Sequence, residues 1–303
     1  MSQTTVLNLP EEELVHPGNR ACAGCGLGII YKTALKALGK NTILVVPPSC
    51  LTVLQGLYPI AASQLPILNV VFASTAAAAT GVVGAMKARK KEGVTVVAFA
   101  GDGGTADIGI QALSGACERG DDFIYICYDN EAYMNTGVQR SGTTPKGVLT
   151  TTTPFTGKRQ GAKNVPAIVA AHGIEYVATA SASYPLDLYD KVKKAMTFKG
   201  VRYIHAHTPC PTGWGFNPRY TVAVGQLAVE SGMYDLYEIE HGVRTLTGPS
   251  SKLLSKTRKP VKEYLTMQSR FKALSPADVE ALQAQTDAKW DTYKVLEANP
   301  QCR

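Results

Sequence analysis

Short apolar runs rich in valine and isoleucine alternate along the chain with stretches whose apolar residues recur at helical spacing. The apolar runs predict buried strands at residues 42–46, 69–73, 94–100, 123–128 and 201–206. The other stretches predict helices at residues 74–91, 108–119, 165–172 and 186–198. Strands that alternate with helices in this order indicate an α/β fold with a mostly parallel sheet and helices on both faces.

The pattern changes in the last third of the chain. Residues 221–237 have helical spacing, residues 241–249 are rich in turn-forming residues, and residues 276–296 predict a polar helix. Because this part offers few core positions of its own, we predict an α/β domain over residues 1–240 and a C-terminal arm over residues 241–303. We expect the arm to pack on a partner subunit.

The composition is that of a folded chain. Of its 303 residues, 45% are hydrophobic, which suffices for a large core, and only 18% are charged, which suggests that a partner covers part of the surface. No run of 18 apolar residues predicts a membrane span, and the N-terminus lacks the basic start and apolar stretch of a secretory signal. We therefore expect a cytoplasmic protein without membrane contact.

The net charge of +7 is concentrated in one segment. Residues 251–273 contain seven Lys or Arg and one Glu, which accounts for +6 and leaves about +1 for the rest of the chain. The charge thus belongs to a tail rather than to a folded basic face, and we expect no nucleic-acid partner. We interpret the segment as a solvated or partner-bound arm, with a docking surface for an acidic protein as the alternative.

Seven cysteines, an odd number without a secretory signal, argue against a disulfide framework. Cys22 and Cys25 form a C-x2-C pair in a glycine-rich stretch, which is typical of a redox dithiol or half a zinc site and also arises by chance. Cys50 and Cys210 each come just beyond a predicted buried strand. The other three are two expected core thiols and one at the chain end: Cys117, Cys127 and Cys302.

Four of these thiols form a candidate metal centre, namely Cys22, Cys25, Cys50 and Cys210. Four thiolates suit either zinc or a [4Fe–4S] cluster. Zinc sites more often consist of two close pairs, whereas here 2, 24 and 159 residues separate successive cysteines. Scattered ligands at strand ends favour a cluster, while zinc and unrelated thiols remain open.

The strongest signal is Gly-Asp-Gly-Gly at residues 101–104, directly after one predicted strand, with Asp129-Asn130 directly after the next. Neighbouring parallel strands would place Asp102 and Asn130 side by side at the carboxyl edge of the sheet, where such sheets bind ligands. Their oxygens suit Mg²⁺ or Ca²⁺, and glycines let backbone N–H groups approach a phosphate. Either sequence alone is typical of a plain turn, but the ordered pair favours a metal–diphosphate site. Neither a dinucleotide-binding motif nor a P-loop motif is present.

This pair resembles the thiamine diphosphate motif, in which GDG is followed after 25 to 30 residues by Asn; 26 residues separate Gly103 from Asn130 here. The motif often ends Asn-Asn, whereas Glu131 follows Asn130. The stretches CAGCG, PPSC, GDGGTADIGIQALSGACERG, YDNEAYMNTGVQRSGTTP and HTPCPTGW resemble the β subunits of 2-oxoacid:ferredoxin oxidoreductases, most closely the pyruvate enzymes. The resemblance covers residues 15–235 and implies a thiamine diphosphate-binding fold.

The resemblance also implies roles for individual residues. The ligands of a [4Fe–4S] cluster would be Cys22, Cys25, Cys50 and Cys210. Mg²⁺ would be held by the side chains of Asp102 and Asn130 and the backbone carbonyl of Ala132. The diphosphate would be lined by Gly101, Gly103 and Gly104. Asn135 and Thr136 would be catalytic residues that face the thiazolium and the substrate, although an amide such as Asn135 can also simply cap a loop.

The implied activity is oxidative decarboxylation of a 2-oxoacid, with single electrons passing to the cluster and on to ferredoxin while coenzyme A accepts the acyl group. Pyruvate is the first choice of substrate; oxalate, 2-oxoisovalerate and 2-oxoglutarate remain open. No motif identifies the glutamate that activates the cofactor in this sequence, and Glu131 lies at the metal end, so the resemblance implies that a partner α subunit supplies it. Two alternatives are a non-catalytic iron–sulfur subunit and a zinc-stabilised α/β binding protein.

Overall fold

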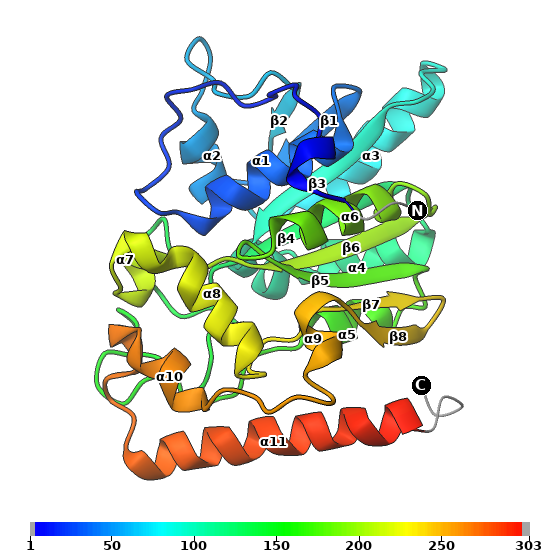
Figure 1. Cartoon of the computed structure of the whole chain (residues 1–303). Coiled ribbons are helices and arrows are strands. Elements are labelled where there is room, and N and C mark those ends of the chain that lie inside the picture. Colours follow the sequence, from blue (N-terminus) through cyan, green and yellow to red (C-terminus); the bar gives the residue numbers. More distant parts are fainter. Residues whose placement is uncertain (1–3, 299–303) are drawn as a thin grey trace.

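The computed structural model describes residues 4–298, which form an α/β domain around one sheet of eight strands (Figure 1). The strands lie in the order β2-β1-β3-β4-β6-β5-β7-β8. The first six in this order are parallel, and β7 and β8 are antiparallel additions at one edge. The strands are β1 (Thr42–Val46), β2 (Ile67–Asn69), β3 (Thr95–Gly101), β4 (Phe123–Asp129), β5 (Tyr176–Ser181), β6 (Val201–His207), β7 (Tyr237–Glu240) and β8 (Val243–Leu246). The predicted fold class is confirmed.

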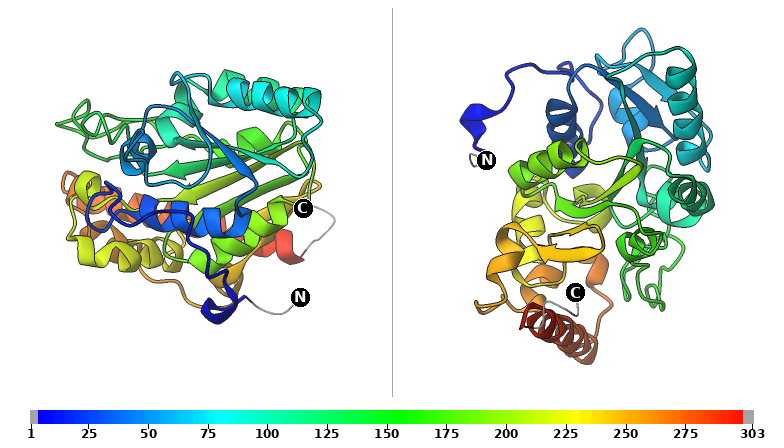
Figure 2. Two further views of the ribbon diagram at one scale, coloured as in Figure 1. Left: turned by 90° about the horizontal axis from the view of Figure 1, so that it is seen from above. Right: turned by 90° about the vertical axis from the view of Figure 1, so that its right-hand side faces the viewer.

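Helices cover both faces of this sheet. The α-helices are α1 (Gly26–Leu38), α2 (Cys50–Gln55), α3 (Thr75–Ala88), α4 (Ile110–Arg119), α5 (Val165–Ala170), α6 (Pro185–Ala195), α7 (Pro211–Trp214), α8 (Thr221–Glu230), α9 (Gly248–Lys252), α10 (Val261–Thr266) and α11 (Pro276–Ala298). Helices α1 and α6 pack on one face, and α3, α4 and α5 pack on the other (Figure 2). None of the helices in residues 4–298 combines the length and apolar character needed to cross a bilayer.

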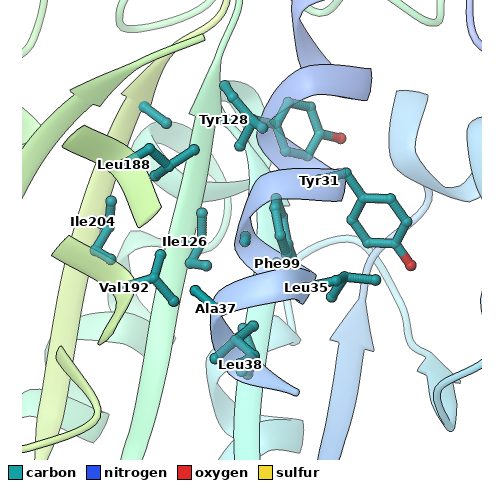
Figure 3. Packing of buried hydrophobic residues seen from close by; sticks show 14 of the residues in the cluster. Tyr31, Leu35, Ala37, Leu38, Phe99, Ile126, Tyr128, Leu188, Val192 and Ile204 are labelled. Atoms are coloured by element: carbon teal, nitrogen blue, oxygen red, sulfur yellow. The ribbon is translucent and has the colours of Figure 1, made fainter. Parts of the chain in front are cut away.

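Successive side chains of a central strand point to opposite faces of the sheet, so each strand contributes to the hydrophobic layers on both faces. On β3, Val97 and Phe99 join the layer under α1 and α6, while Val96, Ala98 and Ala100 join the opposite layer. Phe99 is fully buried and meets the ring of Tyr31 edge-on at 5.6 Å (Figure 3). Burying such a side chain contributes about 1.5–3 kcal/mol. The continuous apolar pattern of these strands follows from this two-sided burial.

The C-terminal part departs from the sequence-based expectation. The helix predicted at residues 221–237 ends at Glu230, and its last predicted residue, Tyr237, starts β7 instead. The turn-rich residues 241–249 contain β8, which forms a hairpin with β7. The prediction assigned Tyr237 to the helix and left residues 238–240 without an element, so it missed the strand β7. The predicted domain boundary after residue 240 falls in the turn of this hairpin.

The basic segment 251–273 packs on the domain of its own chain, which corrects its interpretation as a solvated arm. Four of its apolar side chains are buried in one cluster with residues of α7 and α8: Val261, Tyr264, Leu265 and Phe271. Trp290 of α11 is also fully buried and donates its Nε1–H to the Gly232 carbonyl at 2.9 Å. Packing of the outer surface of this arm on a partner stays a prediction.

Candidate functional site

Asp102 and Asn130 lie side by side, because β3 and β4 are adjacent parallel strands with Gly101 opposite Tyr128. One terminal atom of the Asn130 amide lies 3.1 Å from Asp102 Oδ1 and 2.8 Å from the Ala132 carbonyl oxygen. With its nitrogen there, the amide donates to both oxygens. With its oxygen turned there, the oxygens of Asp102, Asn130 and Ala132 would face one another and form the hard donor set that Mg²⁺ prefers. The three predicted ligands therefore fit Mg²⁺.

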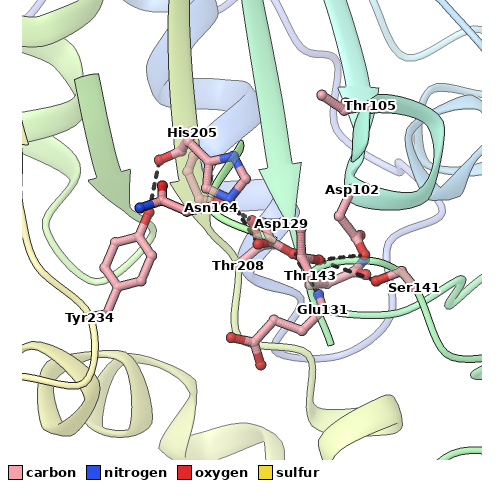
Figure 4. Close-up of polar contacts among 12 residues, drawn as sticks. Asp102, Thr105, Asp129, Glu131, Ser141, Thr143, Asn164, His205, Thr208 and Tyr234 are labelled. Atoms are coloured by element: carbon pink, nitrogen blue, oxygen red, sulfur yellow. Dashed lines mark hydrogen bonds and ion pairs between the residues drawn. The ribbon is translucent and has the colours of Figure 1, made fainter. Parts of the chain in front are cut away.

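Asp102 is buried beside a second carboxylate, Asp129 (Figure 4). Burial, followed by the negative charge of Asp129, raises the pKa of Asp102 well above its usual value. The hydroxyl of Thr143 lies 3.0 Å from Asp102 Oδ2 and 2.8 Å from Asp129 Oδ1, and its single proton serves one carboxylate at a time. A divalent cation would stabilise the ionised form of this pair.

Asp129 is a residue of the candidate site whose contacts the sequence did not reveal. Its Oδ2 lies 2.8 Å from His205 Nε2 on β6, and its Oδ1 accepts from the Glu131 N–H at 2.8 Å. Burial acts to raise the pKa of Asp129, but the hydrogen bond and charge of His205 hold it below the ordinary value. Asp129 thereby fixes the start of the loop that carries Asn130. An acidic residue at a strand end, with His205 two residues before the end of the neighbouring strand, is the signal that could have identified it.

The predicted diphosphate residues surround a cavity of about 200 Å³. Its lining includes nine residues singled out from the sequence: Cys50, Gly101, Asp102, Gly103, Gly104, Asn130, Ala132, Asn135 and Thr136. A Cβ at Gly103 would come within 2.5 Å of the Tyr133 ring, and one at Gly104 within 3.1 Å of Phe72. Side chains of the cavity lining thus leave no room for a Cβ at Gly103 and little room at Gly104, which leaves the backbone there open to a close approach by a phosphate.

A short π-helical turn over Gly103–Asp107 follows Asp102, so α4 begins at Ile110 rather than at the predicted residue 108. The Thr105 hydroxyl donates to the Gly101 carbonyl at 2.8 Å and fixes this turn. Turns of this kind are frequent at functional sites.

Asn135 and Thr136 lie on an exposed loop at the same cavity. The Thr136 hydroxyl donates to Gln139 Oε1 at 2.6 Å. The Asn135 amide has no hydrogen-bond partner within residues 4–298, so it does not cap this loop. Its side chain is available to a molecule bound in the cavity, which agrees with the role that the resemblance implies.

The four cysteines of the candidate metal centre come from three segments at the carboxyl edge of the sheet, because Cys22 and Cys25 share the turn before α1. Cys25 directly precedes α1, Cys50 begins α2 after β1, and Cys210 directly precedes α7 after β6. The Gly26 N–H donates to the Pro209 carbonyl at 3.2 Å, which joins two of these segments. Cys22 is exposed, whereas the other three are partly buried.

The four thiols affect one another electrostatically. Burial and then the charge of Cys210 raise the pKa of Cys50 to about 12, with smaller effects of Cys25 and Cys22. Burial raises the pKa of Cys210 to about 11. Thiolate ligation by these residues would therefore release protons. Within residues 4–298, no three or more His, Cys, Asp or Glu side chains lie where they could together hold a single metal ion. A [4Fe–4S] cluster does not need such a group, because each of its thiolate ligands binds a different iron.

The remaining cysteines fall where the sequence placed them, as far as the structure describes them. Cys117 on α4 and Cys127 on β4 are buried core thiols, which confirms that prediction. Cys302 lies outside the described residues.

Comparisons with known proteins show which proteins this chain is similar to. A family model described as the C-terminal TPP binding domain of thiamine pyrophosphate enzymes matches residues 49–206. Pyruvate synthase subunit PorB of Methanothermobacter thermautotrophicus is 52% identical over 286 residues, covering 93% of this chain and 98% of that protein. Ketoisovalerate oxidoreductase subunit VorB of Pyrococcus abyssi is 44% identical over 300 residues, covering 96% and 95%.

A solved structure has the same fold. It is described as 2-oxoglutarate:ferredoxin oxidoreductase from Magnetococcus marinus with 2-oxoglutarate, coenzyme A and succinyl-CoA bound. It aligns with a TM-score of 0.58 and 25% identity, over 68% of this chain and 70% of that chain.

Proposed function

Since this chain belongs to the β subunits of 2-oxoacid:ferredoxin oxidoreductases, within the thiamine pyrophosphate enzymes, we propose that it carries the metal–diphosphate half of a pyruvate-oxidising site and a [4Fe–4S] cluster. The observation that carries this proposal is the shared cavity. Cys50, a proposed cluster ligand, lines the same 200 Å³ space as Asp102, Asn130 and Gly103. A cluster at Cys50 would then be close enough to accept electrons directly from a cofactor in that cavity.

The residues of this chain bind and orient rather than react. Asp102, Asn130 and the Ala132 carbonyl would hold Mg²⁺, and Gly103 and Gly104 would admit the diphosphate. When bound, thiamine diphosphate supplies an electron sink for decarboxylation of the 2-oxoacid, and a cluster accepts electrons singly. Coenzyme A and ferredoxin complete the proposed reaction as acyl acceptor and electron acceptor.

The substrate is proposed as pyruvate because relatives at 48% to 52% identity are named pyruvate synthase subunits. The VorB relatives at 43% to 44% identity make 2-oxoisovalerate the second candidate. Ferredoxin reduction by the assembled complex, measured with pyruvate, 2-oxoisovalerate, 2-oxoglutarate and oxalate, tests this order. Bound iron without thiamine diphosphate would support the non-catalytic alternative, and bound zinc without iron would support the zinc-stabilised one.

An exposed apolar surface beside the cavity is the proposed contact with the α subunit. It extends over α2, the loop that follows, and the region of β2, which adjoin the cavity through Cys50 and Phe72. Each side chain in it is at least 44% exposed; they are Val53, Leu57, Tyr58, Ile60, Leu68 and Val71. Such a patch on the rim of a cofactor site is typical of an interface. The partner would supply the missing glutamate there.

Replacing Leu57 and Tyr58 together by aspartate is expected to prevent assembly. Buried interface anchors each contribute about 2 kcal/mol or more, so the affinity for the α subunit should fall by about 100-fold or more. Size-exclusion chromatography of the co-expressed subunits measures this loss. Phe155→Asp is the matched control, because Phe155 is 89% exposed on a loop outside the patch. Normal assembly of the double variant would contradict the proposed interface.

The basic segment remains a proposed docking surface for ferredoxin, but deleting it would also remove buried core residues. Four exposed lysines of the segment have no ion-pair partner among the described residues: Lys252, Lys256, Lys262 and Lys272. Replacing all four by glutamate should raise the KM for ferredoxin several-fold at low salt and much less at high salt. The same replacement at the exposed Lys87, Lys90 and Lys91 near the end of α3 is the control. An unchanged KM at low salt would refute docking at this segment.

A further inference from the structure

The loop that carries two proposed magnesium ligands has an unfavourable backbone conformation at its centre. Glu131 lies between Asn130 and Ala132, and its φ of 62° is in the left-handed region. Asparagine tolerates this region better than glutamate does, which gives a physical reason for the frequent second Asn of the motif. Here neighbours hold the backbone instead: the Glu131 N–H donates to Asp129 Oδ1, and its carbonyl accepts from the Thr144 hydroxyl.

The side chain of Glu131 forms a buried ion pair with the C-terminal segment. Its Oε2 lies 2.5 Å from Nη1 of Arg270, and the two side chains are only 12% and 3% exposed. The Arg270 guanidinium also donates to Gln268 Oε1 at 2.9 Å and to the Tyr264 hydroxyl at 3.3 Å. Removing either partner of such a pair leaves an uncompensated buried charge.

Arg270 reaches the same loop by a second contact. Its guanidinium lies 3.7 Å from the ring centroid of Trp214, which is fully buried. The Trp214 Nε1–H donates to the backbone carbonyl of Asn130 at 2.8 Å. One guanidinium therefore stabilises the side chain of Glu131 directly and the backbone of Asn130 through the indole.

We propose that Arg270 is a positioning residue for the magnesium ligands Asn130 and Ala132, and that the C-terminal segment thereby completes the metal loop. This inference rests on the proposed Mg²⁺ site. Arg270 does not line the cavity, yet the affinity for Mg²⁺ depends on it. Outer partners that orient metal ligands typically change metal affinity by about 10- to 100-fold.

The test compares Mg²⁺ affinities of the assembled complex after removal of its cofactors. MgCl₂ is titrated calorimetrically at saturating thiamine diphosphate. Arg270→Met should weaken the affinity by about 10-fold or more. Arg270→Lys keeps the charge without the planar stack and should have an intermediate effect. Combining Arg270→Met with Glu131→Gln removes the unpaired charge, so the double variant should recover part of the affinity that the single variant loses.

Arg258 provides a matched control within the same C-terminal region. Its guanidinium pairs with Asp287 and lies 5.5 Å from the ring centroid of Trp290, but it touches neither Glu131 nor Asn130. Arg258→Met should lower the thermal stability of the cofactor-free protein and leave Mg²⁺ affinity unchanged.

Equal losses of Mg²⁺ affinity in the two Met variants would show a general stability effect and overturn the proposal. So would wild-type affinity in Arg270→Met. If that variant does not fold, Arg270→Lys and the double variant give the same comparison. A wild-type complex that binds no Mg²⁺ with thiamine diphosphate would instead refute the proposed function.

Discussion

Asp102→Asn should abolish magnesium-dependent binding of thiamine diphosphate and, at the same time, stabilise the cofactor-free protein. The first effect follows because the variant replaces the proposed carboxylate ligand with a neutral amide. Loss of an outer partner costs about 10- to 100-fold in metal affinity, so loss of a direct ligand should cost on the order of 100-fold or more. The second effect follows because Asp102 is buried beside the like charge of Asp129.

The two effects separate in thermal unfolding measured with and without Mg²⁺ and thiamine diphosphate. A ligand at 100 times its dissociation constant stabilises the folded state by about 2.7 kcal/mol, and the variant should lose that increment. Asp121→Asn is the control, because Asp121 lies at the opposite end of β4 and pairs with Arg119. Wild-type stabilisation of Asp102→Asn by the cofactors would remove Asp102 from the metal site.

Cys50→Ser should remove most of the iron while it leaves the diphosphate cavity usable. A serine oxygen is a poor replacement for a thiolate in a cluster, so we expect iron content to fall from about four per chain toward zero. Serine keeps nearly the same volume in the cavity wall, and the affinity for thiamine diphosphate should change only a few-fold. Iron analysis and the visible absorption of the purified complex measure the loss.

The control for this variant is Cys117→Ser, which also alters a buried thiol but lies in the core of α4. It should retain the wild-type iron content. Iron at the wild-type level in Cys50→Ser would exclude Cys50 from the ligand set.

The parts of the site that lie directly after strands could be predicted from the sequence. Gly101-Asp102 and Asn130 directly follow apolar runs that are typical of central strands buried on both faces. Because those strands are parallel neighbours, the two proposed ligands, Asp102 and Asn130, lie side by side. Cys50 and Cys210 were identified for the same reason. The local sequence pattern was enough to predict these positions, because the end of a strand fixes the position of the residue that follows it.

The partners that hold these ligands in place could not be predicted. Nothing local distinguishes Arg270 from the other basic residues of segment 251–273, because its burial depends on Trp214 and Glu131 far away in the chain. The apolar residues at positions 261, 264 and 265 have helical spacing and were the available sign that this segment has a buried face. The sequence-based interpretation relied on the net charge of the segment and not on this apolar spacing, and so it did not predict the buried face.

The exposed loop of Cys22 has a consequence for handling the protein in air. Among the four candidate thiols, Cys22 is the exposed one, and the other three are partly buried. If these thiols hold the proposed cluster, a small oxidant such as oxygen would reach the iron bound by Cys22 first, without passing through packed protein. We therefore expect aerobic damage to begin there, so that anaerobic purification, or a partner that shields this loop, decides how long the complex keeps its iron.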